Sequence, residues 1–177
     1  MGLEEALEDR TLRSALTHLP ALPEDAYLSL NSSPPCVLDG SVLAAVEDAP
    51  LERLVLEVTE HSSIEDYSAL AAALAPLRER GMRVAVDDAG AGYASFRHIL
   101  KLRPDFIKLD RALTRRVDED DSRRALAAAL VTFAGETGSR IIAEGVETEA
   151  QRETLADLGV GLMQGYLFGR PGPLQTA

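Results

Sequence analysis

The stretch Val84–Phe96, VAVDDAGAGYASF, joins an apolar run to two adjacent carboxylates and then to a loop of glycine and alanine. A short apolar run of this kind is typical of a strand buried in a parallel sheet. Asp87 and Asp88 repel each other, and they are costly beside a dry core unless a cation is close. The stretch therefore predicts a strand that leads into a cation-binding site.

Short apolar runs alternate with helical segments along the whole chain, which is typical of a parallel α/β architecture. We expect strands near Ala26–Leu30, Leu54–Val58, Arg83–Val86, Phe106–Leu109, Arg140–Ala143 and Gly161–Met163. We expect helices near Leu3–Leu19, Ser41–Glu47, Ile64–Arg80, Ser95–Leu100, Asp121–Thr137 and Glu149–Leu158. A closed (β/α) barrel needs eight strands, so six strands predict either an open sheet or a barrel that lacks two strands.

Composition limits the function. The net charge of −11 argues against binding of long nucleic acid, which requires a basic surface. No apolar run approaches the roughly 18 residues that span a membrane, so we expect no membrane contact by this domain. The acidic start MGLEEALEDR does not resemble a signal peptide, and the single Cys36 fits a reducing compartment. We expect a cytoplasmic domain, or the cytoplasmic part of a membrane-anchored parent.

A polar side chain stands at the end of each predicted strand. The set is Asn31, Glu57, Asp87 with Asp88, Lys108, Glu144 and Gln164. Any one of these could be a solvated strand end, but ligands of parallel sheets bind at the carboxyl ends of the strands. The succession therefore predicts one shared site.

The residue types at these ends favour metal-dependent phosphate chemistry. Oxygen ligands from Asn31, Glu57, Asp87 and Asp88 suit Mg²⁺ or Mn²⁺. Two such ions about 4 Å apart can hold a phosphate and activate water. The chain has only two lysines, and Lys108 inside a strand could orient that water or hold a phosphate oxygen.

Five motifs together resemble the EAL domain family. They are LEVTE (Leu56–Glu60), VDDAGAGYASF (Val86–Phe96), IKLD (Ile107–Asp110), AEGVET (Ala143–Thr148) and QGYLFGRP (Gln164–Pro171). The likeness runs from about residue 26 to residue 171. It implies a TIM-like (β/α) barrel that hydrolyses the bacterial second messenger cyclic di-GMP to linear pGpG, with two Mg²⁺ or Mn²⁺ ions.

The resemblance also implies roles for single residues. Asn31, Glu57 and Asp87 would bind the first metal, and Asp87 would bridge to a second metal that Asp88 also binds. The implied catalytic residues are Lys108 at the attacking water, Glu144 at the second metal or its water, Glu147 as the anchor of the loop after Asp88, and Gln164 on the floor of the site. The implied substrate-binding residues in that loop are Gly90, Gly92 and Tyr93.

The chain departs from the family pattern in two ways. It has Ala89 and Ala91 where the family usually has Phe and Thr. The family's first two strands, with the Glu-Ala-Leu signature, would precede the helix expected at Leu3–Leu19, and the EALEDR of Glu5–Arg10 lies in a helical context that does not match the signature. We therefore expect residues 1–177 to form a single EAL-type domain that is incomplete, with weak or absent hydrolysis.

Several alternatives stay open. The chain is either a fragment of a longer protein, which the persistence of the site residues favours, or a natural truncation. It could also be a cyclic di-GMP receptor or a protein-interaction module without turnover, or an unrelated metal-dependent α/β enzyme. We expect fusion to upstream sensory domains in the parent, and a homodimer is compatible with the family. The outermost strands should pair with another chain, be covered by the first helix, or leave their region disordered.

Overall fold

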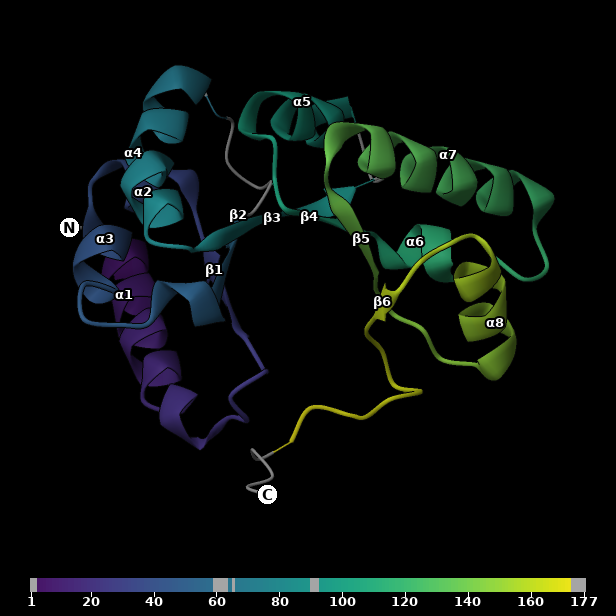
Figure 1. Cartoon of the computed structure of the whole chain (residues 1–177), viewed down its shortest axis with the longest axis horizontal. Coiled ribbons are helices and arrows are strands. Elements are labelled where there is room, and N and C mark those ends of the chain that lie inside the picture. The colour runs from purple at the N-terminus through teal and green to yellow at the C-terminus, as the bar shows by residue number, and fades with distance from the viewer. Residues whose placement is uncertain (1–2, 59–63, 65, 90–92, 173–177) are drawn as a thin grey trace. The chain divides into compact units, whose positions relative to one another are not determined.

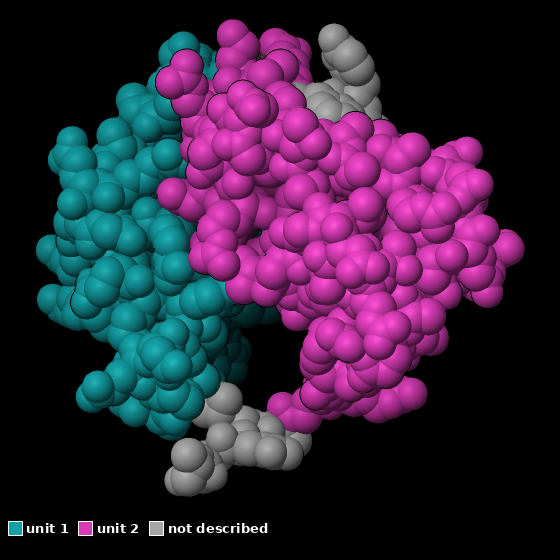
Figure 2. All heavy atoms as spheres, turned by 45° about the vertical axis from the view of Figure 1, so that its right-hand side comes forward, with its two compact units in different colours: residues 1–85, 174–177 teal, residues 86–173 magenta. Residues whose placement is uncertain are grey.

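The computed structural model describes residues 3–58, 64, 66–89 and 93–172. Among residues 3–5, 88, 89 and 93–96 it describes the backbone but not the side chains. The chain divides into two compact units, which Figure 2 shows in different colours. Unit 1 contains the described residues up to Ala85, and unit 2 contains those from Val86 onward. Each unit is described by itself.

The architecture is α/β with six strands, as the sequence predicts, and the order of the strands in the sheet follows the chain (Figure 1). The strands are β1 Leu28–Ser32, β2 Leu54–Val58, β3 Arg83–Ala89, β4 Phe106–Leu109, β5 Arg140–Ala143 and β6 Leu162–Met163. The helices are α1 Leu3–Leu16, α2 Pro34–Leu38, α3 Ser41–Ala45, α4 Tyr67–Glu79, α5 Tyr93–Leu102, α6 Arg111–Thr114, α7 Asp121–Thr137 and α8 Glu149–Asp157. Two 3₁₀ turns cover Leu19–Ala21 and Leu51–Arg53.

Strand and helix bounds agree with the sequence prediction for β2, β4, β5 and α7. The prediction was wrong for β1, which starts later than Ala26 and continues through Ser32, because its pairing with β2 extends to Asn31 opposite Glu57 and to Ser32 opposite Val58. It was also wrong for β3, which continues to Ala89. The two adjacent carboxylates therefore lie within the strand and not beyond it.

Helix ends also differ from the prediction. The first helix ends at Leu16 and not at Leu19, and a separate 3₁₀ turn with Pro20 follows. Pro20 has no N–H to bond to the Leu16 carbonyl oxygen, so continuing the helix through this position would cost a helical hydrogen bond. The predicted helix Ser41–Glu47 is shorter, and Gly40, in the left-handed region at φ +84°, separates it from α2.

Two short helices, α2 and α6, were not predicted. A helix of one turn or slightly more shows no hydrophobic period that could reveal it. Residues at the N-terminus of each of these two helices nevertheless mark where the helix begins. Two prolines open α2, and the Asp110 carboxylate caps α6 by accepting a hydrogen bond of 2.7 Å from the Ala112 N–H.

The core of unit 1 includes the apolar face of α4. Leu70, Leu74 and Leu77 recur at helical spacing and are almost completely buried, and every residue of β2 is buried. The first helix contacts β1, one of the outcomes expected for that strand (Figure 1). Its Glu8 carboxylate accepts hydrogen bonds from Ser32 Oγ at 2.6 Å and from Ser33 N–H at 2.6 Å.

The core of unit 2 forms where α7 contacts β5. Ala127, Leu130 and Ala134 make the buried stripe of α7. The Asp120 carboxylate caps its first turn, and Gly138, at φ +78°, ends it. These caps explain why both ends of the helix could be read from the sequence.

The segment after β6 lies directly on the backbone of Val146. The Val146 N–H donates to Gln164 O at 3.0 Å, and the Leu167 N–H donates to Val146 O at 3.1 Å. A Cβ atom at Gly165 would come within 2.1 Å of Val146 O. Only glycine permits this approach.

We expect Gly165→Ala to lower the free energy of unfolding by about 3 kcal/mol, because the added methyl group collides with backbone that cannot move aside. Urea denaturation measures this loss. Gly161→Ala is the matched control, since its Cβ would meet nothing within 4 Å. Equal stability of the two variants would contradict the close approach.

Candidate functional site

The unit 1 half of the predicted site lies on β1 and β2. Asn31 is in register with Glu57, so their side chains project from the same face of neighbouring strands. Ser29, two residues before Asn31, lies on that face too, and its Oγ donates to Glu57 Oε1 at 2.5 Å. Glu57 is only 7% exposed. The structure therefore brings these two predicted metal ligands together.

Ser29 was not predicted as a site residue. The strand alternation of two residues places it on the face of Asn31, but a hydrogen bond to a residue 28 positions away depends on the strand register. The contact holds the Glu57 carboxylate in one orientation within a buried strand.

The unit 2 half of the predicted site centres on Lys108 in β4. Its Nζ lies 3.1 Å from Asp87 Oδ1 and 2.9 Å from Glu144 Oε1. Lys108 is in register with Ile142, so Glu144, two positions after Ile142, projects from the same face. Residues from β3, from β4 and from the end of β5 therefore meet, as the sequence predicts.

Burial makes these ion pairs obligatory. The Lys108 side chain is 7% exposed, and an ammonium group removed from water needs charged partners. Asp87 and Glu144 retain 20% and 19% exposure, so each carboxylate can also face a ligand. Lysine here holds two like charges close together.

The donor chemistry fits hard divalent cations, because carboxylate and amide oxygens are the ligands that Mg²⁺ and Mn²⁺ prefer. Asp88 lies in β3, but its side chain is outside the described residues. Within the part of the chain that the structure describes, no three His, Cys, Asp or Glu side chains are grouped to hold a metal. Metal binding by Asn31, Glu57, Asp87 and Asp88 stays a prediction.

Glu147 lies at the surface after β5, where its Oε1 accepts from Arg111 Nη2 at 2.6 Å. Its predicted role as anchor of the loop after Asp88 is untested, because the loop residues Gly90 and Gly92 lie outside the described residues. The sequence did not single out Arg111. No short-range pattern could have done so, since the two residues are 36 positions apart.

Gln164 directly follows β6. Its N–H donates to Ala143 O at 2.8 Å, and its side chain is exposed. Tyr93 starts α5, and its side chain is among those the structure does not describe. The proposed contacts of both side chains with substrate stay predictions.

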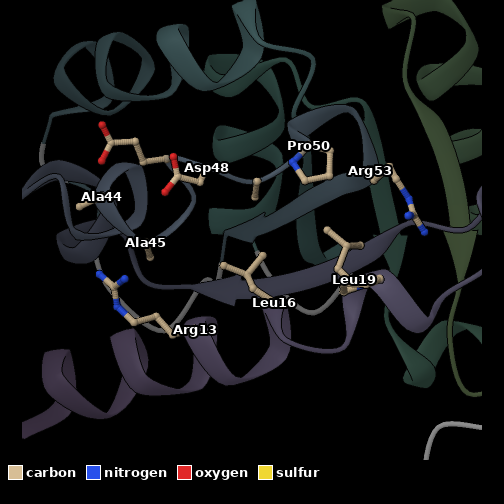
Figure 3. Close-up of a pocket in the computed structure, with 11 residues that line it drawn as sticks. Arg13, Leu16, Leu19, Ala44, Ala45, Asp48, Pro50 and Arg53 are labelled. Atoms are coloured by element: carbon tan, nitrogen blue, oxygen red, sulfur yellow. The ribbon is translucent and has the colours of Figure 1, made fainter.

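A separate groove in unit 1 has a volume of about 530 Å³ (Figure 3). Arg13 and Arg53 lie toward its two ends, with Leu16 and Leu19 between them. Arg53 immediately precedes β2, whereas Glu57 lies near the other end of that strand. The groove is therefore distinct from the predicted site.

The family profile described as EAL domain matches residues 1–171, and the chain therefore belongs to the EAL domain family. Among curated relatives, the bifunctional diguanylate cyclase/cyclic di-GMP phosphodiesterase MucR of Pseudomonas aeruginosa is 38% identical over 122 residues, which are 69% of this chain and 18% of MucR. The cyclic di-GMP phosphodiesterase PA2567 of the same organism is 34% identical over 179 residues, which cover 96% of this chain and 30% of that protein. The chain thus spans less than a third of each of these relatives.

Solved structures show the same fold. The phosphodiesterase part of MucR in complex with cyclic di-GMP has a TM-score of 0.78 and 31% identity, covering 97% of this chain and 72% of that one. BlrP1 of Klebsiella pneumoniae, in a complex with manganese and cyclic di-GMP, has a TM-score of 0.81 and 28% identity, covering 97% and 46%. The α/β architecture is thus that of the TIM-like EAL domains, as the resemblance implies.

Within the described ranges, no helix has both the length and the apolar character needed to cross a membrane.

We expect Lys108→Met to lower the free energy of unfolding by about 2 kcal/mol. Removing the ammonium group takes away the positive charge that holds the Asp87 and Glu144 carboxylates close together, although their partial exposure reduces the penalty below that of a fully buried pair. Denaturant titration measures this loss. Lys101→Met, at an exposed position of α5, changes only the other lysine and should stay within about 0.5 kcal/mol of wild type. Equal losses would contradict the proposed charge balance.

Proposed function

We propose that this chain is a cyclic di-GMP phosphodiesterase domain that hydrolyses the dinucleotide to linear pGpG. The observation that carries the proposal is the convergence of Asp87 and Glu144 on the buried amine of Lys108. Asp87 lies in β3, Lys108 lies in β4, and Glu144 directly follows β5. Barrels of the α/β class carry their active sites at the carboxyl ends of the strands. Relatives named as cyclic di-GMP phosphodiesterases support the same substrate.

Two divalent cations, Mg²⁺ or Mn²⁺, complete the proposed site. Asn31, Glu57 and Asp87 would hold one and Asp88 the other, with Asp87 shared. Bound metal supplies a Lewis acid for the phosphate and lowers the pKa of water. The manganese complex of BlrP1 supports this choice, because that relative binds manganese together with cyclic di-GMP.

The protein side chains orient the reacting groups. The Lys108 ammonium lies within 3.1 Å of Asp87 Oδ1 and 2.9 Å of Glu144 Oε1, where it can donate a hydrogen bond to the attacking water or to a phosphate oxygen. Glu144 fixes the direction of that amine. Within unit 1, the Ser29 hydroxyl keeps the Glu57 carboxylate in place.

The remaining proposed residues contact substrate or support its loop. Gln164 lines the floor, Glu147 anchors the loop after Asp88, and Gly90, Gly92 and Tyr93 let that loop approach the dinucleotide. We further propose that the domain works in the cytoplasm, as a homodimer, within a longer protein that has upstream sensory domains.

A second candidate function is a cyclic di-GMP receptor without turnover. One observation favours it. Lys108 places a positive charge beside Asp87 and Glu144, so one cationic group is present in this part of the site before any metal binds. Tight binding that does not depend on metal would separate the receptor from the enzyme.

The test is incubation of residues 1–177 with cyclic di-GMP and Mn²⁺, followed by chromatographic quantification of pGpG. We expect slow product formation that chelator abolishes and that Lys108→Met reduces by at least about 100-fold. Lys101→Met should retain the wild-type rate. Metal-independent binding without product would establish the receptor instead, and neither binding nor product would overturn both candidates.

A further inference from the structure

We propose that Arg111 is a positioning residue for Glu144, because it clamps the turn on which Glu144 stands. The turn is Glu144–Glu147, between β5 and α8. Arg111 opens α6, which follows β4, so the clamp joins the segments that follow two neighbouring strands.

The first contact is with Gly145, at φ +65° in the left-handed region. A Cβ atom at Gly145 would lie 2.5 Å from Arg111 Cγ and 3.0 Å from both Cβ and Cδ of Arg111. The aliphatic stem of the arginine therefore lies flat on the glycine. Glycine is needed here both for its backbone conformation and for the space that the stem fills.

The second contact is the charge-assisted hydrogen bond between Arg111 Nη2 and Glu147 Oε1, 2.6 Å long. One side chain thus touches the turn on both sides of Val146. The backbone completes the restraint, since the Glu144 N–H donates to Leu109 O at 3.2 Å and the Val146 N–H donates to Gln164 O at 3.0 Å.

The short helix α6, which begins with Arg111, is itself held by hydrogen bonds. Asp110 caps α6, and the Arg123 guanidinium of α7 donates to the carbonyl oxygens of Ala112 and, at 3.0 Å, of Arg115. These bonds satisfy carbonyl groups of a helix that has only one turn. Arg111 therefore starts from a rigid position, which a residue that positions another requires.

The consequence for the site is direct. Glu144 opens the turn, and its carboxylate must stay 2.9 Å from Lys108 Nζ to direct the amine. A left-handed glycine immediately after Glu144 would otherwise allow the turn to rotate. The clamp restricts this rotation without contacting substrate or the reacting atoms.

Positioning is distinguishable from general stabilisation, because the ion pair is exposed. The Arg111 and Glu147 side chains are 59% and 40% accessible, and exposed ion pairs add little to global stability. Loss of the clamp should change the turn while leaving the unfolding midpoint nearly unchanged.

The test measures amide hydrogen exchange at Glu144 and Val146 in the whole chain. We expect roughly tenfold faster exchange in Arg111→Ala, which removes stem and charge, and about threefold in Arg111→Met, which keeps a stem. Arg111→Lys should recover most of the protection. Arg116→Ala is the matched control, since Arg116 is another exposed arginine of unit 2 and pairs with Glu119.

A second readout follows the Glu144–Lys108 contact itself. The chain has two lysines, so an amine-acylating reagent and peptide mass spectrometry can compare Lys108 with Lys101 in the same molecule. We expect Lys108 to react at least about tenfold more slowly than Lys101 in the wild type, because it is buried and ion-paired, and to become severalfold more reactive in Arg111→Ala. The control variant should leave the ratio unchanged.

Unchanged exchange at the turn, an equal effect in Arg116→Ala, or uniform loss of protection throughout unit 2 would overturn the proposal. For turnover, which rests on the proposed function, kcat should fall severalfold with KM unchanged, and faster exchange with an unaltered kcat would also overturn it. If the wild type makes no product, the proposed function fails separately, and the exchange and acylation results still decide the role of Arg111.

Discussion

The buried amine of Lys108 is the constraint on which the rest of the candidate site depends. An ammonium group in β4 requires carboxylates within reach, and it finds them on β3 and at the end of β5. The same requirement explains how an acidic chain with a net charge of −11 can hold two carboxylates so close together. The lysine determines which residues can face a ligand, because it fixes the direction of both acids.

Backbone contacts around Val146 keep this arrangement in place. Gly165 allows the segment after β6 to lie on the Val146 backbone, and Gly145 allows Arg111 to lie on the turn from the α6 side. Both glycines are needed because another chain segment occupies the space of a side chain. The turn that carries Glu144 is therefore restrained from two directions, which fits a role in orienting a reacting group.

In unit 1, a hydrogen bond also restrains a predicted site residue, Glu57. Glu57 is an acid inside a fully buried strand, and a neutral hydroxyl from Ser29 restrains it. Carboxylate oxygens are ligands that Mg²⁺ and Mn²⁺ prefer, so this acid suits the predicted metal site.

The sequence by itself determined the α/β class, the bounds of β2, β4, β5 and α7, and the family, because strand alternation, caps and the five motifs are local properties. It also predicted that Asp87, Lys108 and Glu144 would meet, since parallel strands end at a common edge. Tertiary structure alone decided the bond from Ser29 to Glu57, the continuation of β3 through its acids, and the clamp of Arg111 on Gly145 and Glu147. Those features depend on strand register and on contacts between residues about 30 positions apart, which no local pattern encodes.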